Sequence, residues 1–224
     1  MVSRRSSYKY LIDIILPNRC PVCSKVIKWD KLVCEKCIDT LPLAELNKSG
    51  AEECEMTYSA FVYKDKVKDL IYSLKYSGAS GNFAEYSAML TAGYMKIDGV
   101  ADKIDIVTAV PMHISKKRLR GGDQAELLAK LTADILGKPA DLHLLKRTRD
   151  KTEQHMLSAR ERKQHADMVY IKNPKHGRID GKTVLICDDV ITTGSTMNAC
   201  ARLLKEMGAA AVYGCSAAKT DHDE

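Results

Sequence analysis

The sequence predicts an α/β protein in which a parallel sheet is covered by helices on both faces, preceded by a small metal-binding module. Apolar runs of strand length alternate with segments of helical periodicity from residue 56 to residue 215, and such alternation is typical of parallel sheets. Four of the eight cysteines stand between residues 20 and 37, in a stretch too short to bury a core of its own. We expect the module in residues 1–48 and the α/β domain in residues 49–224 of this 224-residue chain.

The first half of the α/β domain has the pattern of two strands and two helices. Val67, Leu70, Ile71 and Leu74 recur at spacings of three and four residues, which predicts one apolar face of a helix that ends near Gly78. The predicted elements are a strand at Met56–Tyr63, this helix, a helix at Asn82–Met95, and a strand at Ile104–Val110 that is closed by Pro111.

The second half continues the alternation. Gly137 and Pro139 follow a helical pattern at Ala125–Leu136, as is common beyond a helix end. The predicted elements in chain order are the helix Ala125–Leu136, the strand Leu142–Leu145, a polar helix Ser158–His165, the strands Met168–Ile171 and Thr183–Cys187, the helix Thr196–Met207 and the strand Ala210–Cys215.

The four clustered cysteines form two CxxC pairs, Cys20-Pro-Val-Cys23 and Cys34-Glu-Lys-Cys37. Each pair can place two thiolates on one turn, and two facing turns supply the tetrahedral four-sulfur site of structural zinc. The alternative is a redox CxxC, which usually occurs singly and in a βαβ context that this stretch lacks. We therefore predict a structural zinc held by Cys20, Cys23, Cys34 and Cys37.

The other four cysteines are scattered, which disfavours a disulfide scaffold and suggests small buried side chains. No secretory signal pattern precedes them, and no window reaches the apolar length of a membrane span. We expect a cytoplasmic protein with no membrane span.

The sharpest motif is the run Val184-Leu185-Ile186-Cys187-Asp188-Asp189, followed by an uncharged, hydroxyl-rich loop. A buried strand that ends in two acids delivers them to the edge where open α/β sheets bind ligands. Both acids can serve one ligand if the chain already turns at Asp188. The loop that follows opens a helix, whose N–H groups and dipole favour a phosphate. The alternative interpretation is an N-capped helix that follows a strand, with the two acids merely exposed to solvent. Two adjacent acids and a hydroxyl-rich loop are more than an N-cap requires, so the run predicts a ribose 5-phosphate pocket.

Taken with further motifs, this run resembles the phosphoribosyl pyrophosphate loop of type I phosphoribosyltransferases, and more narrowly the ComF family of competence-associated proteins. The further motifs are the four-cysteine ribbon, Leu74-Lys75-Tyr76-Ser77-Gly78, Val110-Pro111-Met112-His113, Arg118-Leu119-Arg120-Gly121, Gln124 and Thr152-x-Gln154. The resemblance covers nearly the whole chain. It implies a type I phosphoribosyltransferase-like sheet, with phosphoribosyl pyrophosphate and magnesium as ligands.

The resemblance also implies roles for individual residues. Asp188 and Asp189 would hold the ribose hydroxyls, and the loop from Thr192 would hold the 5-phosphate. The predicted site residues are Asp188, Asp189, Val190, Ile191, Thr192, Thr193, Gly194, Ser195 and Thr196; the pyrophosphate loop Pro111, Met112, His113, Lys117 and Arg118; and the flap Arg147, Arg149, Lys151 and Gln154. The family usually has Gly-Phe-Asn-Gln where this chain reads Gly121-Gly122-Asp123-Gln124, and an Asn where His165 stands.

The formal net charge of +6 lies mainly in residues 111–182. Cationic residues follow two predicted strands there, around Lys116 and around Arg147, and such loops can converge on an anion at one sheet edge. A solvated face and a nucleic-acid surface are the alternatives. Aromatic residues are sparse in these loops, which gives no sign of base stacking.

Three functions follow. The first is a phosphoribosyltransferase that displaces pyrophosphate with a nitrogen nucleophile. In purine-salvage enzymes of the superfamily an Asp that assists base deprotonation stands at the position of Thr192, and Thr cannot serve as that base at neutral pH. The second is a protein that binds phosphoribosyl pyrophosphate and acts in DNA uptake, with single-stranded DNA and uptake proteins as partners. The third is a scaffold whose pocket is vestigial. We favour the second.

Overall fold

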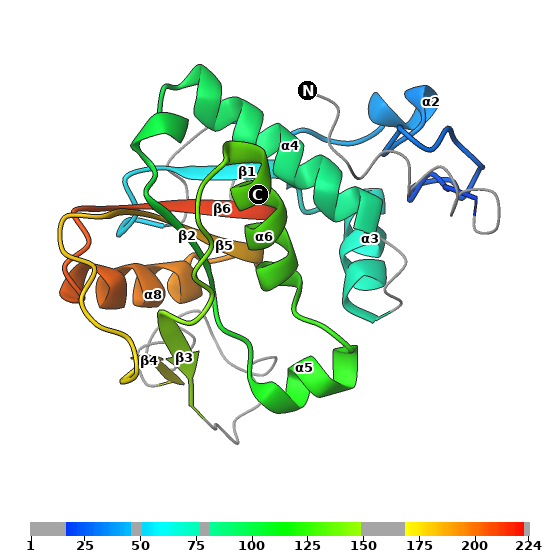
Figure 1. The fold of residues 1–224 in the computed structure, drawn as a ribbon. Helices are drawn as coiled ribbons and strands as arrows, with labels where there is room; N and C mark the ends of the chain where they lie inside the picture. Colours follow the sequence, from blue (N-terminus) through cyan, green and yellow to red (C-terminus); the bar gives the residue numbers. More distant parts are fainter. Residues whose placement is uncertain (1–16, 46–50, 77–80, 149–168, 222–224) are drawn as a thin grey trace.

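The computed structural model describes residues 17–45, 51–76, 81–148 and 169–221. Its centre is a four-stranded parallel sheet with the strand order β1-β6-β5-β2 (Figure 1). The strands are β1 (Thr57–Val62), β2 (Ile106–Ala109), β5 (Thr183–Ile191) and β6 (Ala211–Lys219). The predicted parallel sheet is confirmed.

Helices cover both faces of this sheet, as predicted (Figure 1). On one face, Leu185 and Cys187 of β5 pack into an apolar cluster with α4 (Gly81–Ile97), α6 (Gln124–Leu136) and α3 (Asp65–Tyr76). On the other face, Val184 and Ile186 pack into a second cluster with α8 (Ser195–Glu206). The alternation along β5 shows why its apolar run is continuous: both faces of the strand are buried.

Both edges of the parallel sheet are covered by short stretches of backbone. Beside β1, Ala44 donates a hydrogen bond from its N–H to the carbonyl of Ala60, and Val62 donates to Pro42. Beside β2, Val107 donates to Pro139 and accepts from Asp141. Part of each edge is thereby paired with backbone, which limits pairing with another chain.

Two short strands lie outside the parallel sheet. β3 (Leu145–Arg147) and β4 (Tyr170–Lys172) form a separate antiparallel pair, shifted by one to three residues from the predicted strands Leu142–Leu145 and Met168–Ile171. Leu145 and Tyr170 are buried, whereas Ile171 is exposed. The pair therefore packs only one face, against α8.

The four-cysteine module packs directly on the α/β domain. Cys20, Cys37 and Leu41 belong to the same apolar cluster as Phe61 of β1, and Asn82 at the start of α4 donates a hydrogen bond to Asn18 at 2.6 Å. A one-turn helix, α2 (Glu35–Ile38), begins at the second cysteine pair. The predicted domain boundary, between residues 48 and 49, lies outside the described residues.

Three further segments differ from the predicted ones. A 3-10 turn, η1 (Ala101–Lys103), precedes β2. A helix, α5 (Ile114–Arg120), occupies most of the predicted pyrophosphate loop, which spans residues 111–118. The predicted helix Ser158–His165 lies outside the described residues. Within the described part of the chain, no helix has the length and apolar character needed to cross a membrane.

Candidate functional site

A crevice opens along β5 because its neighbour β2 is shorter. β2 ends at Ala109, which pairs with Cys187, and the chain then leaves the sheet after Val110, whose N–H donates to the carbonyl of Cys187 at 2.8 Å. From Asp188 onward β5 keeps only β6 as a strand neighbour. Open parallel sheets bind ligands at such carboxyl-end crevices.

Two adjoining pockets fill this crevice. The first has a volume of about 300 Å³ and contains the acidic pair and the Thr-Gly loop. The second, of about 220 Å³, lies between the ends of β2, α5 and β4. Five residues line both pockets and form the seam between them: Lys75, Asp188, Asp189, Val190 and Thr196.

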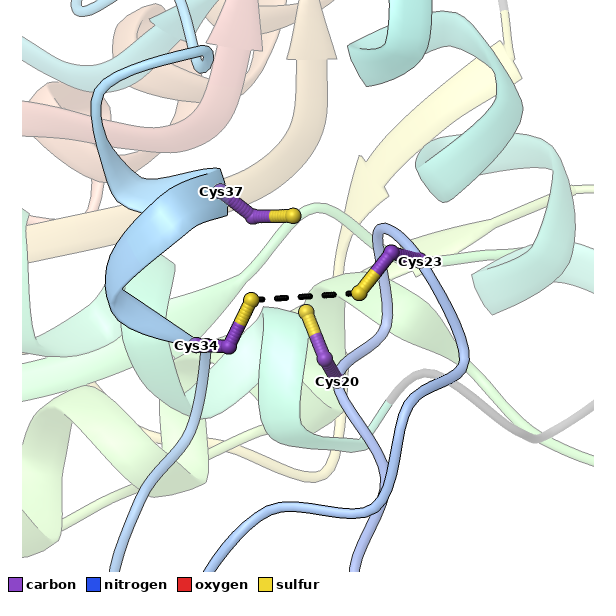
Figure 2. A group of neighbouring side chains, drawn as sticks. All are labelled: Cys20, Cys23, Cys34 and Cys37. Carbon is purple, nitrogen blue, oxygen red and sulfur yellow. Dashed lines mark hydrogen bonds between the residues drawn. The ribbon is translucent and has the colours of Figure 1, made fainter.

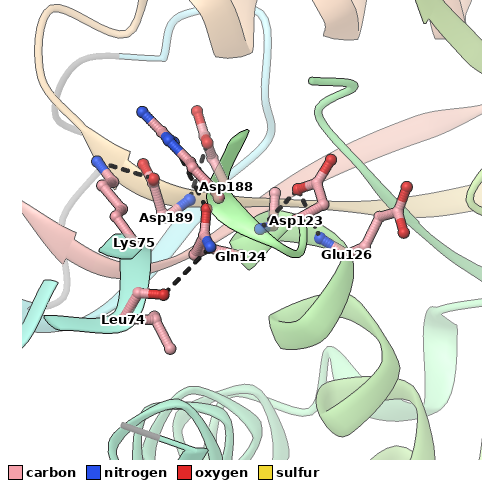
Figure 3. Close-up of polar contacts among 9 residues, drawn as sticks. Leu74, Lys75, Asp123, Gln124, Glu126, Asp188 and Asp189 are labelled. Atoms are coloured by element: carbon pink, nitrogen blue, oxygen red, sulfur yellow. Dashed lines mark hydrogen bonds and ion pairs between the residues drawn. The ribbon is translucent and has the colours of Figure 1, made fainter. Parts of the chain in front are cut away.

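The acidic pair is held by local contacts and by one lysine (Figure 3). The N–H of Asp189 donates a hydrogen bond to Oδ1 of Asp188 at 2.8 Å. Nζ of Lys75, in the last turn of α3, lies 2.9 Å from Oδ2 of Asp189. Desolvation, reinforced by the charge of Asp189, raises the pKa of Asp188 to about 8. Lys75 therefore places a positive charge against an acidic pair in which burial disfavours the ionised form of Asp188.

The expectation that the chain turns at Asp188 is wrong, because β5 continues to Ile191. Both acids nevertheless line both pockets. The reason is that the crevice runs alongside the open edge of β5 rather than beyond its end, so side chains that alternate along the strand reach the same space.

The loop after β5 has the form of an anion site. Gly194 adopts a left-handed conformation with φ 69° and opens α8 without a side-chain cap, so the first N–H groups of the helix have no side-chain acceptor there. The hydroxyls of Thr193 and Ser195 are 2.9 Å apart, and Thr220 donates to the carbonyl of Thr192. Uncapped N–H groups with hydroxyls beside them suit a phosphate.

The second pocket is rich in cations. Lys116 and Arg120 of α5 and Arg147 of β3 line it together with Lys75. Arg147 donates a hydrogen bond to the hydroxyl of Tyr170 at 3.0 Å. The two acids of β5 and Asp123 line the same pocket. The pocket can receive a ligand that carries several negative charges.

The predicted pyrophosphate-loop residues are divided between the pocket and other contacts. Pro111 and Met112 line the second pocket. His113 instead caps α5, accepting a hydrogen bond from the N–H of Ser115. Lys117 pairs with Glu126, Arg118 is exposed, and neither lines either pocket.

The predicted ligand-binding residues Val190 and Ile191 and the predicted 5-phosphate residues Thr192, Thr193, Gly194, Ser195 and Thr196 all line the first pocket. Of the predicted flap residues, Arg147 lines the second pocket, and Arg149, Lys151 and Gln154 lie outside the described residues, as does His165.

Several lining residues were not predicted as site residues. Tyr63 and Lys75 reach the first pocket from the β1–α3 region, and Tyr170 reaches the second from β4. Lys75 stands in the motif Leu74-Lys75-Tyr76, so a sequence signal for it existed; Tyr63 and Tyr170 had none. Asp123 caps α6 with Oδ1 and lines the second pocket. Burial raises its pKa.

The four cysteines of the module converge on one point (Figure 2). Their sulfur atoms all lie within 4.8 Å of one another, and those of Cys23 and Cys34 are 3.8 Å apart. A tetrahedral zinc with Zn–S distances of about 2.3 Å requires sulfur atoms about 3.8 Å apart. The predicted zinc site therefore fits the structure.

The protonation of these thiols also fits a metal site. Burial acts to raise the pKa of Cys20, but hydrogen bonds from the N–H groups of Cys34, Cys23 and Val22 outweigh it and lower the pKa to about 7. Burial and the neighbouring sulfurs raise the pKa of Cys37 to about 12. A bound zinc would hold these side chains as thiolates and offset the repulsion between their charges.

Two family models match the chain. One, described as a phosphoribosyl transferase domain, matches residues 88–222. The other, described as a double zinc ribbon domain, matches residues 11–49, which include all four clustered cysteines.

Several curated proteins are similar to the chain. The DNA utilization protein YhgH of Escherichia coli K12 is 31% identical over 203 residues, which cover 86% of each chain. Competence protein F of Haemophilus influenzae is 31% identical over 46% of this chain and 45% of its own. Competence protein ComFC of Bacillus subtilis is 25% identical over 68% of this chain and 59% of its own.

Among solved structures, a purine phosphoribosyltransferase from Pyrococcus horikoshii matches 55% of this chain and 68% of its own, with 20% identity and a TM-score of 0.35. A phosphoribosylpyrophosphate synthetase from Mycobacterium smegmatis matches 57% of this chain and 33% of its own, with 23% identity and the same TM-score.

Proposed function

Since the chain belongs to the ComF/YhgH family, in which a phosphoribosyltransferase domain follows an N-terminal zinc ribbon, we propose that its crevice binds phosphoribosyl pyrophosphate and that the protein acts in DNA uptake. The observation that carries the proposal is the pairing of two adjoining pockets with different chemistry. One offers carboxylates and an uncapped helix start, and the other offers cations.

Each part of the ligand has a matching part of the crevice. The loop Thr192–Thr196 takes the 5-phosphate through N–H groups and hydroxyls. Asp188 and Asp189 accept hydrogen bonds from the ribose hydroxyls. The diphosphate enters the second pocket, where Lys116, Arg120 and Arg147 supply positive charge.

Magnesium accompanies the diphosphate in this proposal. Its ligands would come from the carboxylates of Asp188 and Asp189 and from the diphosphate itself, because Mg²⁺ prefers oxygen ligands and is usually bound through one or two carboxylates plus phosphates. The raised pKa of Asp188 then means that metal or sugar binding displaces a proton from this carboxyl.

Phosphoribosyl transfer is the chemistry open to such a complex. A nitrogen nucleophile would form a bond to the anomeric carbon as the bond to the diphosphate breaks, and the cations of the second pocket would stabilise the departing anion. Thr192 offers no base at neutral pH. The alternative function is therefore an active phosphoribosyltransferase whose acceptor loses its proton without a general base at the position of Thr192.

A second function, binding of single-stranded DNA beside the crevice, is favoured by a row of side chains that we call the aromatic rim. Nζ of Lys68 lies 6.0 Å from the ring centroid of Tyr63, the rings of Tyr72 and Tyr76 are 4.7 Å apart, and the guanidinium of Arg120 lies 5.4 Å from the ring of Tyr76. These five residues are the rim. Bases stack on such exposed rings while cations meet the backbone.

The rim supplies the stacking groups that the basic loops lack in the sequence. Tyr72 and Tyr76 are 66% and 53% exposed, and Tyr63 and Arg120 also line the two pockets. The relatives are named for DNA utilization and competence, which supports a role with DNA. Zinc-binding thiols that must stay reduced support the cytoplasm as its compartment.

The proposal is tested by direct measurement of phosphoribosyl pyrophosphate binding. Isothermal titration with magnesium present should give one site per chain, and titration with magnesium removed should give weaker binding. Release of pyrophosphate with a panel of bases and amines then separates a binding protein from an active transferase.

A further inference from the structure

Lys75 stands where the two pockets meet and is the only cationic side chain among the described residues that lines both. Its ammonium nitrogen lies 2.9 Å from Oδ2 of Asp189, and the two side chains are only 21% and 17% exposed. The lysine therefore occupies one oxygen of a carboxylate that the proposed ligand needs. A ribose hydroxyl or a metal that binds the same oxygen has to share it with Lys75.

The backbone that carries Lys75 is fixed by a contact from a different helix (Figure 3). Nε2 of Gln124, at the start of α6, donates a hydrogen bond to the carbonyl of Leu74 at 3.1 Å. Gln124 is 5% exposed. The last turn of α3 is thus anchored, whereas Lys75 carries its ammonium on a flexible four-carbon stem.

We propose that Lys75 is a diphosphate-binding residue stored on Asp189, and that ligand binding exchanges this ion pair for one between Lys75 and the diphosphate. The inference rests on the proposed function, because it assigns a residue to the same site. Charge supports it. The ligand brings several negative charges into a pocket that already holds Lys116, Arg120 and Arg147, and an ammonium at the seam gains more from that anion than from one carboxylate.

The exchange has a consequence for selectivity. Ribose 5-phosphate would fill the first pocket, with its phosphate held by the loop Thr192–Thr196, and would place no diphosphate in the second pocket. Pyrophosphate would fill the second pocket and would offer its charge to Lys75. Loss of the lysine charge should therefore weaken diphosphate ligands and spare ribose 5-phosphate, which no longer has to compete with the ammonium for Asp189.

The test is isothermal titration of the full-length protein and its Lys75→Met, Lys75→Arg and Lys66→Met variants with three probes in the presence of magnesium: phosphoribosyl pyrophosphate, inorganic pyrophosphate and ribose 5-phosphate. Lys66 is an exposed residue of the same helix, nine positions and about two and a half turns away, and serves as the matched control.

Lys75→Met should raise the dissociation constants of both diphosphate ligands by about tenfold or more, as expected for the loss of one charge-assisted contact. The dissociation constant of ribose 5-phosphate should change by less than about threefold, Lys75→Arg should restore part of the affinity, and Lys66→Met should behave as the wild type.

Two results overturn the exchange alone: wild-type binding of phosphoribosyl pyrophosphate that Lys75→Met leaves unchanged, or an equal loss for all three probes, which indicates a structural role for Lys75. Wild-type protein that binds none of the probes overturns the proposed function and the exchange with it.

Discussion

Arg147 and Tyr170 form one unit at the wall of the second pocket: the guanidinium donates a hydrogen bond to the hydroxyl at 3.0 Å and lies 5.3 Å from the centroid of the same ring. The two residues come from the two strands of the separate antiparallel pair, where they stand opposite each other. Tyr170 is buried, so the tyrosine fixes the arginine rather than the reverse. The strand pair thus holds a positive charge in position at the crevice.

Removal of the Tyr170 hydroxyl should leave the Arg147 guanidinium less firmly positioned while its positive charge is kept. We expect Tyr170→Phe to weaken phosphoribosyl pyrophosphate binding by about fivefold, the size of one lost hydrogen bond of about 1 kcal/mol, and to leave ribose 5-phosphate binding unchanged. Titration calorimetry measures both. Arg147→Lys, which keeps the charge but cannot form the same planar contact, should give a similar loss; full affinity in both variants would contradict the role assigned to the pair.

Asp188 should make the ligand-free protein less stable as the pH rises. The pKa of Asp188 in the folded protein, about 8, lies above the ordinary value of 3.8. Its contribution to folding stability is therefore fully present below pH 4, where the carboxyl is protonated, and is lost progressively up to pH 8. At pH 7 the loss amounts to about 4 kcal/mol for a fully buried group. Because Asp188 is only half-buried, we expect Asp188→Asn to stabilise the ligand-free protein by about half of that.

Thermal unfolding between pH 5 and pH 8 measures this effect. A gain of about 2 kcal/mol at pH 7 corresponds to a rise in Tm of about 4–8 °C for a chain of this size, and the gain should shrink towards pH 5. Asp189→Asn serves as the comparison, since it removes the partner of Lys75 and should not stabilise. A Tm difference for Asp188→Asn that does not change with pH would count against the raised pKa.

Zinc removal should destabilise the α/β domain as well as the ribbon. The two parts share an apolar cluster that includes Cys20 and Phe61, and residues 42–44 hydrogen-bond to β1. We expect a strong chelator to lower the Tm of the whole protein by about 10 °C, because structural zinc contributes several kcal/mol to folding. Calorimetry and a zinc assay check this.

The Cys54→Ser variant is the control for zinc removal, because Cys54 is buried outside the four-sulfur cluster. It should keep one zinc per chain, whereas Cys34→Ser should lose the metal. Zinc content that is equal in the two variants would show that the four-cysteine cluster is not the site.

Binding of single-stranded DNA should depend on the aromatic rim. We expect Tyr76→Ala to weaken binding of an oligonucleotide by about tenfold, since one base–aromatic stack is worth about 1–3 kcal/mol, and Tyr76→Phe to retain it. Fluorescence anisotropy at fixed salt makes the comparison. Tyr94, a half-buried tyrosine of α4, provides a control at a site away from the rim; equal losses for Tyr76→Ala and Tyr94→Ala would mean that the rim has no special part in DNA binding.

The parts of the fold that sequence reasoning predicted are those encoded locally. The CxxC spacing of Cys20 and Cys23, and of Cys34 and Cys37, follows from the turn that each pair makes. The run Val184–Asp189 combines the pattern of a buried strand with two acids, and this pattern can be recognised without knowledge of distant residues. The resemblance extended these local signals to the whole domain, and the family models agree with it.

The parts that were missed depend on long-range packing or lack apolar periodicity. The helix α5 has no buried residue, so its cationic sequence carried no helical pattern. Tyr170 enters the crevice only because β4 packs on α8, and Tyr76 meets Arg120 across 44 positions of sequence. The extension of β5 through Asp188 and Asp189 was missed because two acids normally end a strand, whereas here the open edge of the sheet accommodates them.

The central claim is that the acidic pair of β5 belongs to a phosphoribosyl pyrophosphate site. Isothermal titration of wild-type protein and of the Asp188→Asn, Asp189→Asn double variant, with magnesium present and absent, tests it most directly. We expect magnesium-dependent binding of one ligand per chain by the wild type and a loss of at least about a hundredfold in the double variant, with the zinc content unchanged. Wild-type protein that does not bind, or a double variant that binds as the wild type does, would show that the acidic pair does not form such a site.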